Sequence, residues 1–188
     1  TYSVGVAYNN RKTSLQFIQQ EMNNITALSN ETCQLGIQSR NMVLYIAKKD
    51  SPQPIRLMSS VGKQLPLYCT GLGRALLAYK SEEEIRSLFP EVLTAYTPHT
   101  IATINDLLKE LELTRQRGYA VEHEETNLMV NCIAVSLDYN NAPIAALSIS
   151  IPTFRISESK EKEAVQILWE AKQRIETHFK MYGVDFGN

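Results

Sequence analysis

The feature of this sequence that most limits its possible folds is a pair of strand-like segments near the C-terminus. Residues 131–137 and 143–151 are rich in alanine, valine, isoleucine and serine, and the turn-forming run Tyr139-Asn140-Asn141-Ala142 lies between them. Two strands joined by so short a turn can pair only in the antiparallel direction, because a parallel pair needs a crossover of about a dozen residues or more. The sequence therefore predicts an antiparallel sheet.

The remaining strand-like segments extend this sheet. Residues 32–37 and 42–47 flank a second turn, Ser39-Arg40-Asn41, while residues 55–60 and 119–121 are shorter strand candidates. The predicted order along the chain is one helix, three strands, a block of helices, three strands and a final helix. Hairpin-joined strands beside separate helical blocks are typical of the α+β class. We therefore predict an α+β fold with a mainly antiparallel six-stranded sheet flanked by helices.

The helices are predicted from apolar periodicity and from capping residues. A helix of about four turns near the N-terminus and a final helix over residues 158–179 each carry apolar side chains at three- and four-residue steps. The pattern Ser81-x-x-Glu84 is a capping box, and Thr103-x-x-Asp106 begins a helix that Gly118 ends. The apolar residues of the first helix are Leu15, Ile18, Met22, Ile25 and Leu28.

The helix predicted over residues 70–79 begins with two glycines, Gly71 and Gly73. Glycine in a helix interior costs about 1 kcal/mol relative to alanine, so its use twice in one turn needs a reason. Thr70 is a suitable N-cap, which leaves the next N–H groups without partners inside the helix and open to a small anion. Alternatively, the glycines allow the helix to pack closely against a strand. The sequence leaves both interpretations open.

Composition excludes several classes of function. The chain has 188 residues, 44% of them hydrophobic, which is enough for one well-buried core. Its 19 basic and 20 acidic residues give no basic excess, so we do not expect this chain to bind DNA directly. No apolar run approaches the roughly 20 residues of a membrane span, and we expect a cytoplasmic location without membrane contact.

The cysteines and histidines do not predict a metal or cofactor site. Cys33, Cys69 and Cys132 are widely separated and form no C-x-x-C pair, which argues against a zinc ribbon or a redox pair. The three histidines are isolated from one another in the sequence. We therefore expect no metal and no cofactor.

Four segments together resemble a known family. "PLYCTGLGRALLA", "TRQRGYAVEHEETN", "NCIAVS" and "AALSISIPTFRIS" occur in an order and spacing similar to the C-terminal effector-binding domain of IclR-type bacterial transcriptional regulators, over about residues 10–180. The resemblance implies a GAF-like fold, assembly as a homodimer or a dimer of dimers, and a ligand-sensing function without enzymatic activity. The implied effector is a small organic acid such as a keto acid, sugar acid or aromatic acid, and the implied full protein is a repressor of a catabolic operon.

The resemblance also implies a domain organisation. Such regulators contact operator DNA through an N-terminal winged helix-turn-helix domain, and a chain that begins at Thr1 instead of Met is expected to be a piece lacking it. Residues 1–29 would be a linker and connecting helix, and residues 30–182 the effector-binding domain. The apolar stripe of the connecting helix would transmit the effector signal, or simply cover the sheet.

The effector site is implied residue by residue from the same motifs. Ser148 and Ser150 would lie on one face of their strand, because alternate residues of a strand share a face. The family often has aspartate where this chain has Glu122, glycine where it has Met129, and a smaller residue where it has Leu72, so the effector is expected to be compact or differently shaped. The implied effector-binding residues are Gly71, Leu72, Glu122, Cys132, Ser148 and Ser150.

The acidic cluster has a second interpretation. Glu122, Glu124 and Glu125 could form an acid/base pair. More commonly such a cluster is a solvated strand end, or the partner of a helix dipole or an arginine. In an extended segment Glu122 and Glu124 would share a face, and Glu125 would point the other way.

The cysteine thiols suggest an alternative to the ligand-sensing function. Cys132 with His123 could form a nucleophile and base, and Cys69 precedes a helix start that would stabilise a thiolate. The alternative is therefore a GAF-like thiol redox sensor or enzyme that uses Cys69 or Cys132. A buried structural thiol is the simpler interpretation of each.

Overall fold

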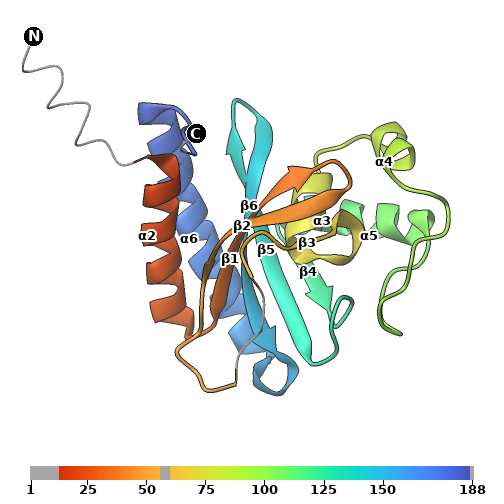
Figure 1. The fold of residues 1–188 in the computed structure, drawn as a ribbon, viewed down its shortest axis with the longest axis horizontal. Helices are drawn as coiled ribbons and strands as arrows, with labels where there is room; N and C mark the ends of the chain where they lie inside the picture. The colour runs from red at the N-terminus through yellow and green to blue at the C-terminus, as the bar shows by residue number, and fades with distance from the viewer. Residues whose placement is uncertain (1–12, 56–59, 187–188) are drawn as a thin grey trace, which may run out of the picture.

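A six-stranded antiparallel sheet lies at the centre of the molecule, with helices on both of its faces (Figure 1). The computed structural model describes residues 13–55 and 60–186. The strand order is β3-β2-β1-β6-β5-β4, and every neighbouring pair is antiparallel. The predicted α+β class is confirmed.

The elements follow the predicted order. The strands are β1 (Thr32–Ser39), β2 (Met42–Lys49), β3 (Gln64–Pro66), β4 (Ala120–His123), β5 (Val130–Tyr139) and β6 (Ala142–Pro152). The helices are α2 (Ser14–Ser29), α3 (Gly71–Leu77), α4 (Glu82–Leu88), α5 (Ile104–Arg117) and α6 (Glu158–Tyr182), with short 3-10 helices η1 (Leu67–Cys69) and η2 (Thr153–Arg155). Most of the strand predicted over residues 55–60 lies outside the described residues, and β3 was not predicted.

The two faces of the sheet differ in side-chain size. One face carries large aliphatic residues, such as Leu35, Ile133 and Leu147, which pack against α2 and α6. The opposite face carries small residues such as Ala134 and Ala146, which pack with residues of α3 and α5. Large and small side chains alternate along strands β5 and β6, and successive side chains of a strand point to opposite faces, so the large ones gather on one face and the small ones on the other. The small side chains allow α3 to approach the sheet closely.

Helices α2 and α6 cover the aliphatic face side by side (Figure 1). The predicted stripe of α2 is confirmed at Ile18, Met22 and Ile25, which are buried. The stripe is wrong at Leu28, which is 58% exposed, because the buried side of the last turn of α2 carries Ile25, Thr26 and Ser29 instead. The apolar stripe predicted for the final helix is confirmed in α6, where Ala164, Leu168, Ala171, Ile175 and Phe179 are buried.

Helices α3, α4 and α5 form a second group on the small-residue face (Figure 1). Their predicted caps are confirmed. The Thr70 hydroxyl accepts a hydrogen bond from the N–H of Gly73, and Ser81 forms a complete capping box with Glu84. Thr103 caps α5, which Gly118 ends with a positive φ of 79°. Across the described ranges, no helix combines the length and the apolar character needed to cross a bilayer.

Candidate functional site

A small cavity lies between the start of α3 and the small-residue face of the sheet, and we refer to it as the central cavity. Its volume is about 20 Å³, which is room for about one water molecule. Of the six predicted site residues, five line it: Gly71, Leu72, Glu122, Cys132 and Ser148. The fold therefore brings together residues that are up to 77 positions apart in the chain, from Gly71 to Ser148.

Ser148 is the most informative residue of the central cavity. Its side chain is 1% exposed, and its hydroxyl oxygen has no hydrogen-bond partner among the residues that the structure describes. Leaving a buried hydroxyl unpaired costs about 1–3 kcal/mol, and such groups are rare in native structures. This hydroxyl is therefore suited to a hydrogen bond with a ligand or an ordered water.

Ser150 has a supporting position instead. Its hydroxyl donates to Gln34 Oε1 at 3.0 Å and lies 3.2 Å from Cys132 Sγ. Ser150 pairs with Cys132, and Ser148 pairs with Ala134, two residues further along β5. Both pairs therefore lie on one face of the sheet, as predicted for the two serines. Ser150 does not line the central cavity but orients two residues that do.

Sequence reasoning missed several polar lining residues, namely Gln34, Tyr45, Lys63, Thr70, Thr126 and Asn127, and two of them matter most for the chemistry of the cavity. Gln34 is a buried residue of β1 that lies opposite Ser148 in the sheet register. Lys63 precedes β3 and is an exposed cation that lines the cavity. A buried polar residue inside an apolar strand was the available signal for Gln34. No sequence signal pointed to Lys63, because it lies outside the motifs that carry the family resemblance.

Glu122 is a buried carboxyl group at the end of β4. Its Oε1 accepts hydrogen bonds from the N–H groups of Glu125, at 2.5 Å, and Thr126, at 3.3 Å. Burial raises the pKa of this carboxyl group to about 7, although the backbone hydrogen bonds oppose the shift. Near neutral pH the protonated form is therefore populated, and it can donate a hydrogen bond to an oxygen of a ligand.

The two glycines of α3 are explained mainly by close packing. A Cβ atom on Gly73 would lie 2.1 Å from the Leu67 carbonyl oxygen, and one on Gly71 would lie 3.3 Å from Cys132 Cβ. The N–H of Gly73 donates to the Thr70 hydroxyl at 3.0 Å. Anion binding at this helix start is therefore limited to the N–H groups of Gly71 and Leu72.

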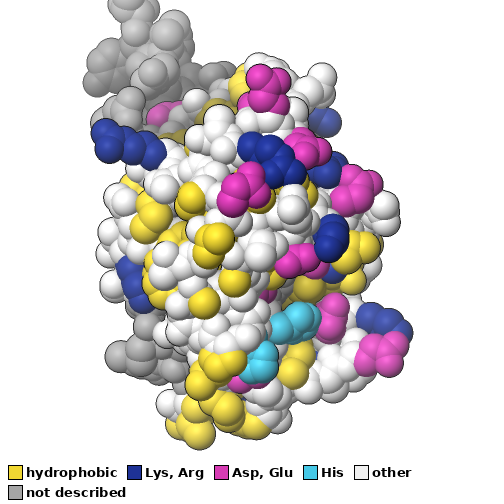
Figure 2. Space-filling view, turned by 90° about the vertical axis from the view of Figure 1, so that its right-hand side faces the viewer, with side chains coloured by type: hydrophobic (Ala, Val, Ile, Leu, Met, Phe, Trp, Pro, Cys, Tyr) yellow, Lys and Arg dark blue, Asp and Glu magenta, His cyan; other side chains and the backbone are white. Residues whose placement is uncertain are grey.

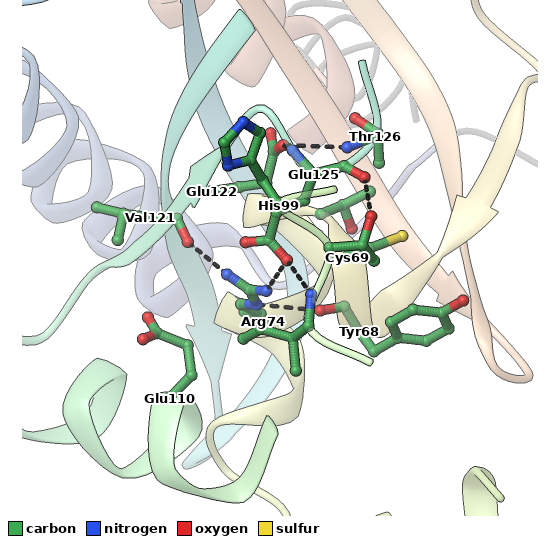
Figure 3. A network of polar contacts seen from close by, with 12 residues as sticks. Tyr68, Cys69, Arg74, His99, Glu110, Val121, Glu122, Glu125 and Thr126 are labelled. Atoms are coloured by element: carbon green, nitrogen blue, oxygen red, sulfur yellow. Dashed lines mark hydrogen bonds and ion pairs between the residues drawn. The ribbon is translucent and has the colours of Figure 1, made fainter. Parts of the chain in front are cut away.

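Glu125 is the partner of a buried arginine (Figure 3). Its Oε2 accepts hydrogen bonds from Arg74 Nη2 and from the N–H of Ile101. Arg74 also donates to the carbonyl oxygens of Tyr68, at 3.0 Å, and Val121, at 2.9 Å. Of the interpretations of the acidic cluster, the arginine partner is therefore the correct one for Glu125.

The expectation that Glu122 and Glu124 share a face is wrong. Strand β4 ends at His123, and Glu124 has a left-handed φ of 54°, which turns the chain. Met129, at the other end of this loop, also has a left-handed φ of 67°, and its N–H donates to Glu124 Oε1 at 2.6 Å. The position where the family usually has glycine thus keeps the backbone conformation that favours glycine.

The thiols do not have the properties of reactive groups. Burial raises the pKa of Cys69 to about 12, and it also raises the pKa of Cys33 and of Cys132. The thiolate is the nucleophilic form of cysteine, so a raised pKa disfavours both redox sensing and catalysis. His123 lies 3.0 Å from Asn131 Oδ1 in the sheet edge, whereas Cys132 lies opposite Glu122. The proposed Cys132–His123 pair therefore does not form.

The arrangement is suited to binding rather than to catalysis. Three hydrogen-bonding groups line the central cavity beside the start of α3. They are the hydroxyl of Ser148, the amide of Gln34 and the carboxyl group of Glu122. Within residues 13–55 and 60–186, no group of three or more His, Cys, Asp or Glu side chains could hold a metal ion. The fold and the arrangement of these groups are those expected of a ligand-binding domain rather than of a metal centre.

Comparison with known proteins identifies the family. The family model described as "Bacterial transcriptional regulator IclR C-terminal" matches residues 8–177 of this chain. The chain therefore belongs to the IclR family of bacterial transcriptional regulators and corresponds to its C-terminal domain.

Curated relatives are themselves regulators. The chain is 38% identical over 157 residues to the HTH-type transcriptional regulator KdgR of Dickeya chrysanthemi. The aligned residues cover 82% of this chain and 52% of that protein. The chain is 32% identical over 178 residues to the HTH-type transcriptional repressor AllR of Escherichia coli K12, covering 94% of this chain and 66% of the repressor. The chain thus spans between about half and two thirds of the length of these relatives.

A solved structure supports the same assignment. The crystal structure of the C-terminal domain of the E. coli transcriptional regulator KdgR superposes with a TM-score of 0.79 and is 32% identical in sequence. The match covers 87% of this chain and 96% of that domain.

Proposed function

We propose that this chain is the effector-sensing domain of a DNA-binding transcriptional regulator and that it binds a small organic acid in the central cavity. The named functions of KdgR and AllR support a role in regulation. By extension from these relatives, the full protein represses a catabolic operon and contacts operator DNA through a separate N-terminal domain. Residues 1–29 then connect the two parts, and residues 30–182 bind the effector as a homodimer or a dimer of dimers in the cytoplasm.

The observation that carries this proposal is the unpaired hydroxyl of Ser148. Four more residues implied by the family motifs surround the same cavity. A ligand oxygen that hydrogen-bonds to Ser148 would remove the cost of burying this group without a partner. The ligand class, whether keto acid, sugar acid or aromatic acid, is open.

The charges around the central cavity favour an anion. The N–H groups of Gly71 and Leu72 lie at the positive end of α3, and Lys63 is the cation among the described lining residues. Glu122 would repel an anion only when ionised, and its raised pKa keeps part of it neutral near pH 7. Binding of a carboxylate should therefore favour the protonated form of Glu122.

A metabolite needs more space than the central cavity offers. Cavities that enclose small molecules usually have volumes of about 300–1,000 Å³, whereas this one has about 20 Å³. Lys63 and Leu65 line it from the side of β3, a strand of three residues that pairs only with β2. We expect β3 to move outward when the effector binds, since it has the fewest strand hydrogen bonds to break.

The first test is binding of candidate acids to the wild-type domain and to Ser148→Ala. Thermal shift and calorimetry with 2-keto acids, sugar acids and aromatic carboxylates identify a ligand, which at 100 times its dissociation constant adds about 2.7 kcal/mol of stability. We expect Ser148→Ala to weaken binding at least tenfold without lowering the stability of the free domain, since the lost hydroxyl has no partner.

Ser150→Ala is the matched control on the same strand face. It removes the hydrogen bond to Gln34 and should lower the free energy of unfolding by about 1 kcal/mol. A ligand that binds wild-type protein and Ser148→Ala equally well would show that the central cavity is not the effector site.

A further inference from the structure

A group of large hydrophobic side chains remains exposed at one end of the sheet, and we refer to it as the loop patch. Its members are Ile55, Leu128, Met129 and Phe154. Each of the four is between 55% and 63% exposed. This end of the sheet is the lower one in Figure 1, and hydrophobic side chains gather at the foot of the face seen in Figure 2.

Backbone hydrogen bonds hold the segments of the loop patch side by side. The N–H of Thr153, the residue before Phe154, donates to the Met129 carbonyl oxygen at 2.9 Å. Arg155 Nη2 donates to the Ile55 carbonyl oxygen at 3.1 Å. The patch is therefore contiguous, although its residues come from three separate parts of the chain. Single exposed hydrophobic residues are normal, whereas contiguous ones mark interaction sites.

The backbone of Met129 gives a second reason to regard this surface as functional. Of the non-glycine residues with a left-handed φ in the described part of the chain, Met129 alone is apolar. A residue with a Cβ pays a cost in free energy for this conformation, which glycine avoids. A polar side chain would also suit the exposed position better. An exposed, strained methionine is explained if another surface covers it.

The charges beside the loop patch are satisfied within the chain. Arg155 donates to both carboxylate oxygens of Glu31 at 2.7 Å, and its guanidinium group lies 5.0 Å from the centre of the Phe154 ring. Glu124 Oε1 accepts from the N–H of Met129 at 2.6 Å, which turns this carboxylate toward its own loop. Nucleic acid or a lipid surface would need a free cation here, whereas Arg155 is already paired.

This charge pattern favours a second copy of the chain as the partner. A two-fold axis brings each group close to its own copy, so an unbalanced charge would repel itself. A patch whose charged groups are paired internally avoids this repulsion. Its size is also informative, because a stable dimer buries about 800 Å² on each copy. Four partly exposed side chains supply only part of this area, so the contact should be reversible.

We propose that the loop patch is the surface through which two copies of this chain associate. A two-fold axis places the patch of one copy against the same patch of the other and covers Met129 and Phe154 in both. Thr126 and Asn127, which line the central cavity, directly precede Leu128, so the partner also restrains one wall of that cavity. The proposal rests on the self-association included in the proposed function and not on a ligand in the cavity.

The test is analytical ultracentrifugation of this chain over a hundredfold range of protein concentration. Wild-type protein should show a reversible equilibrium between monomer and dimer. Phe154→Ser and Met129→Gly should each raise the dissociation constant of the dimer at least tenfold. Met129→Gly should not lower the melting temperature of the monomer, because glycine adopts the left-handed φ without strain. Weaker association without a loss of monomer stability separates a contact residue from one that supports the fold.

Met181→Ser is the matched control, since Met181 is a 68% exposed methionine on α6, outside the loop patch. It should leave the dissociation constant unchanged. A dimer that tolerates both Phe154→Ser and Met129→Gly uses another surface, which overturns the assignment of the patch alone. A wild-type chain that stays monomeric at every concentration overturns the self-association as well and leaves the patch to a different partner. Effector binding is tested independently by Ser148→Ala.

Discussion

At the scale of single residues, burial decides the chemistry of Glu122. The carboxyl group is 1% exposed and its pKa is raised from 4.5 to about 7. The folded protein therefore binds this proton more tightly than the unfolded chain does. By linkage, the free energy of unfolding falls as pH rises from about 4.5 to about 7, by an amount on the order of 3 kcal/mol.

Glu122→Gln should remove this contribution. Glutamine stays neutral and keeps an oxygen that can accept from the N–H of Glu125. The free energy of unfolding of the variant minus that of wild-type protein should therefore increase by about 3 kcal/mol as the pH rises from 4.5 to 7.5. Urea unfolding at each pH measures this difference. Glu83→Gln, on the exposed side of α4, is the control. A wild-type-to-variant difference that is constant over this range would contradict the argument.

The lining residues of the central cavity that could be predicted are those inside the family motifs. Gly71, Leu72, Glu122, Cys132 and Ser148 were found because four short segments occur together in order. Lining residues from β1 and from the segment before β3 were missed, since only the sheet register brings them to the cavity. Strand pairing between distant segments is not encoded in any local pattern of the sequence.

At the scale of elements, the start of α3 is fixed by its contact with η1. A Cβ on Gly73 would lie 2.1 Å from the Leu67 carbonyl oxygen and 2.4 Å from Leu67 Cα, and backbone atoms cannot move aside cheaply. Gly73→Ala should therefore destabilise the protein by about 3 kcal/mol or more, even though alanine is the better helix former.

Gly71→Ala is the comparison for this prediction. Its added Cβ would lie 3.3 Å from Cys132 Cβ, a contact that a small shift relieves, so the loss of stability should stay below about 1 kcal/mol. Denaturant unfolding of both variants measures the difference. Equal losses for the two variants would show that close packing against η1 does not explain the second glycine.

Local signals predicted the helices better than the edge of the sheet. Thr70, Ser81, Thr103 and Gly118 are caps whose hydrogen bonds are formed within a few residues, so the sequence alone located the helix ends. Strand β3 has three residues and ends in Pro66, and its pairing with β2 rather than any propensity makes it a strand.

At the scale of the whole molecule, the Arg74–Glu125 pair joins segments that are far apart in the chain. Arg74 contacts the 3-10 helix η1 and strand β4, while Glu125 holds the N–H of Ile101 (Figure 3). Both side chains are buried. Removing one member would leave the other as an unpaired buried charge, which typically costs 3–5 kcal/mol.

A double-mutant cycle tests this coupling. Arg74→Leu and Glu125→Leu should each destabilise the protein by about 3–5 kcal/mol, and the double variant should lose clearly less than the sum. The exposed pair of Arg86 and Glu82 is the control, with an expected coupling below about 1 kcal/mol. Additive losses at Arg74 and Glu125 would mean that the pair does not act as one unit.

The small volume of the central cavity also limits how fast the domain can respond to a ligand that binds there. If the central cavity, with its volume of about 20 Å³, is the effector site, neighbouring atoms have to move before a metabolite reaches Ser148, so an opening step precedes or accompanies each binding event. The rate of response then approaches the frequency of opening as the metabolite accumulates, instead of rising without limit. A sensor built in this way responds no faster than its site opens, however high the concentration of its signal.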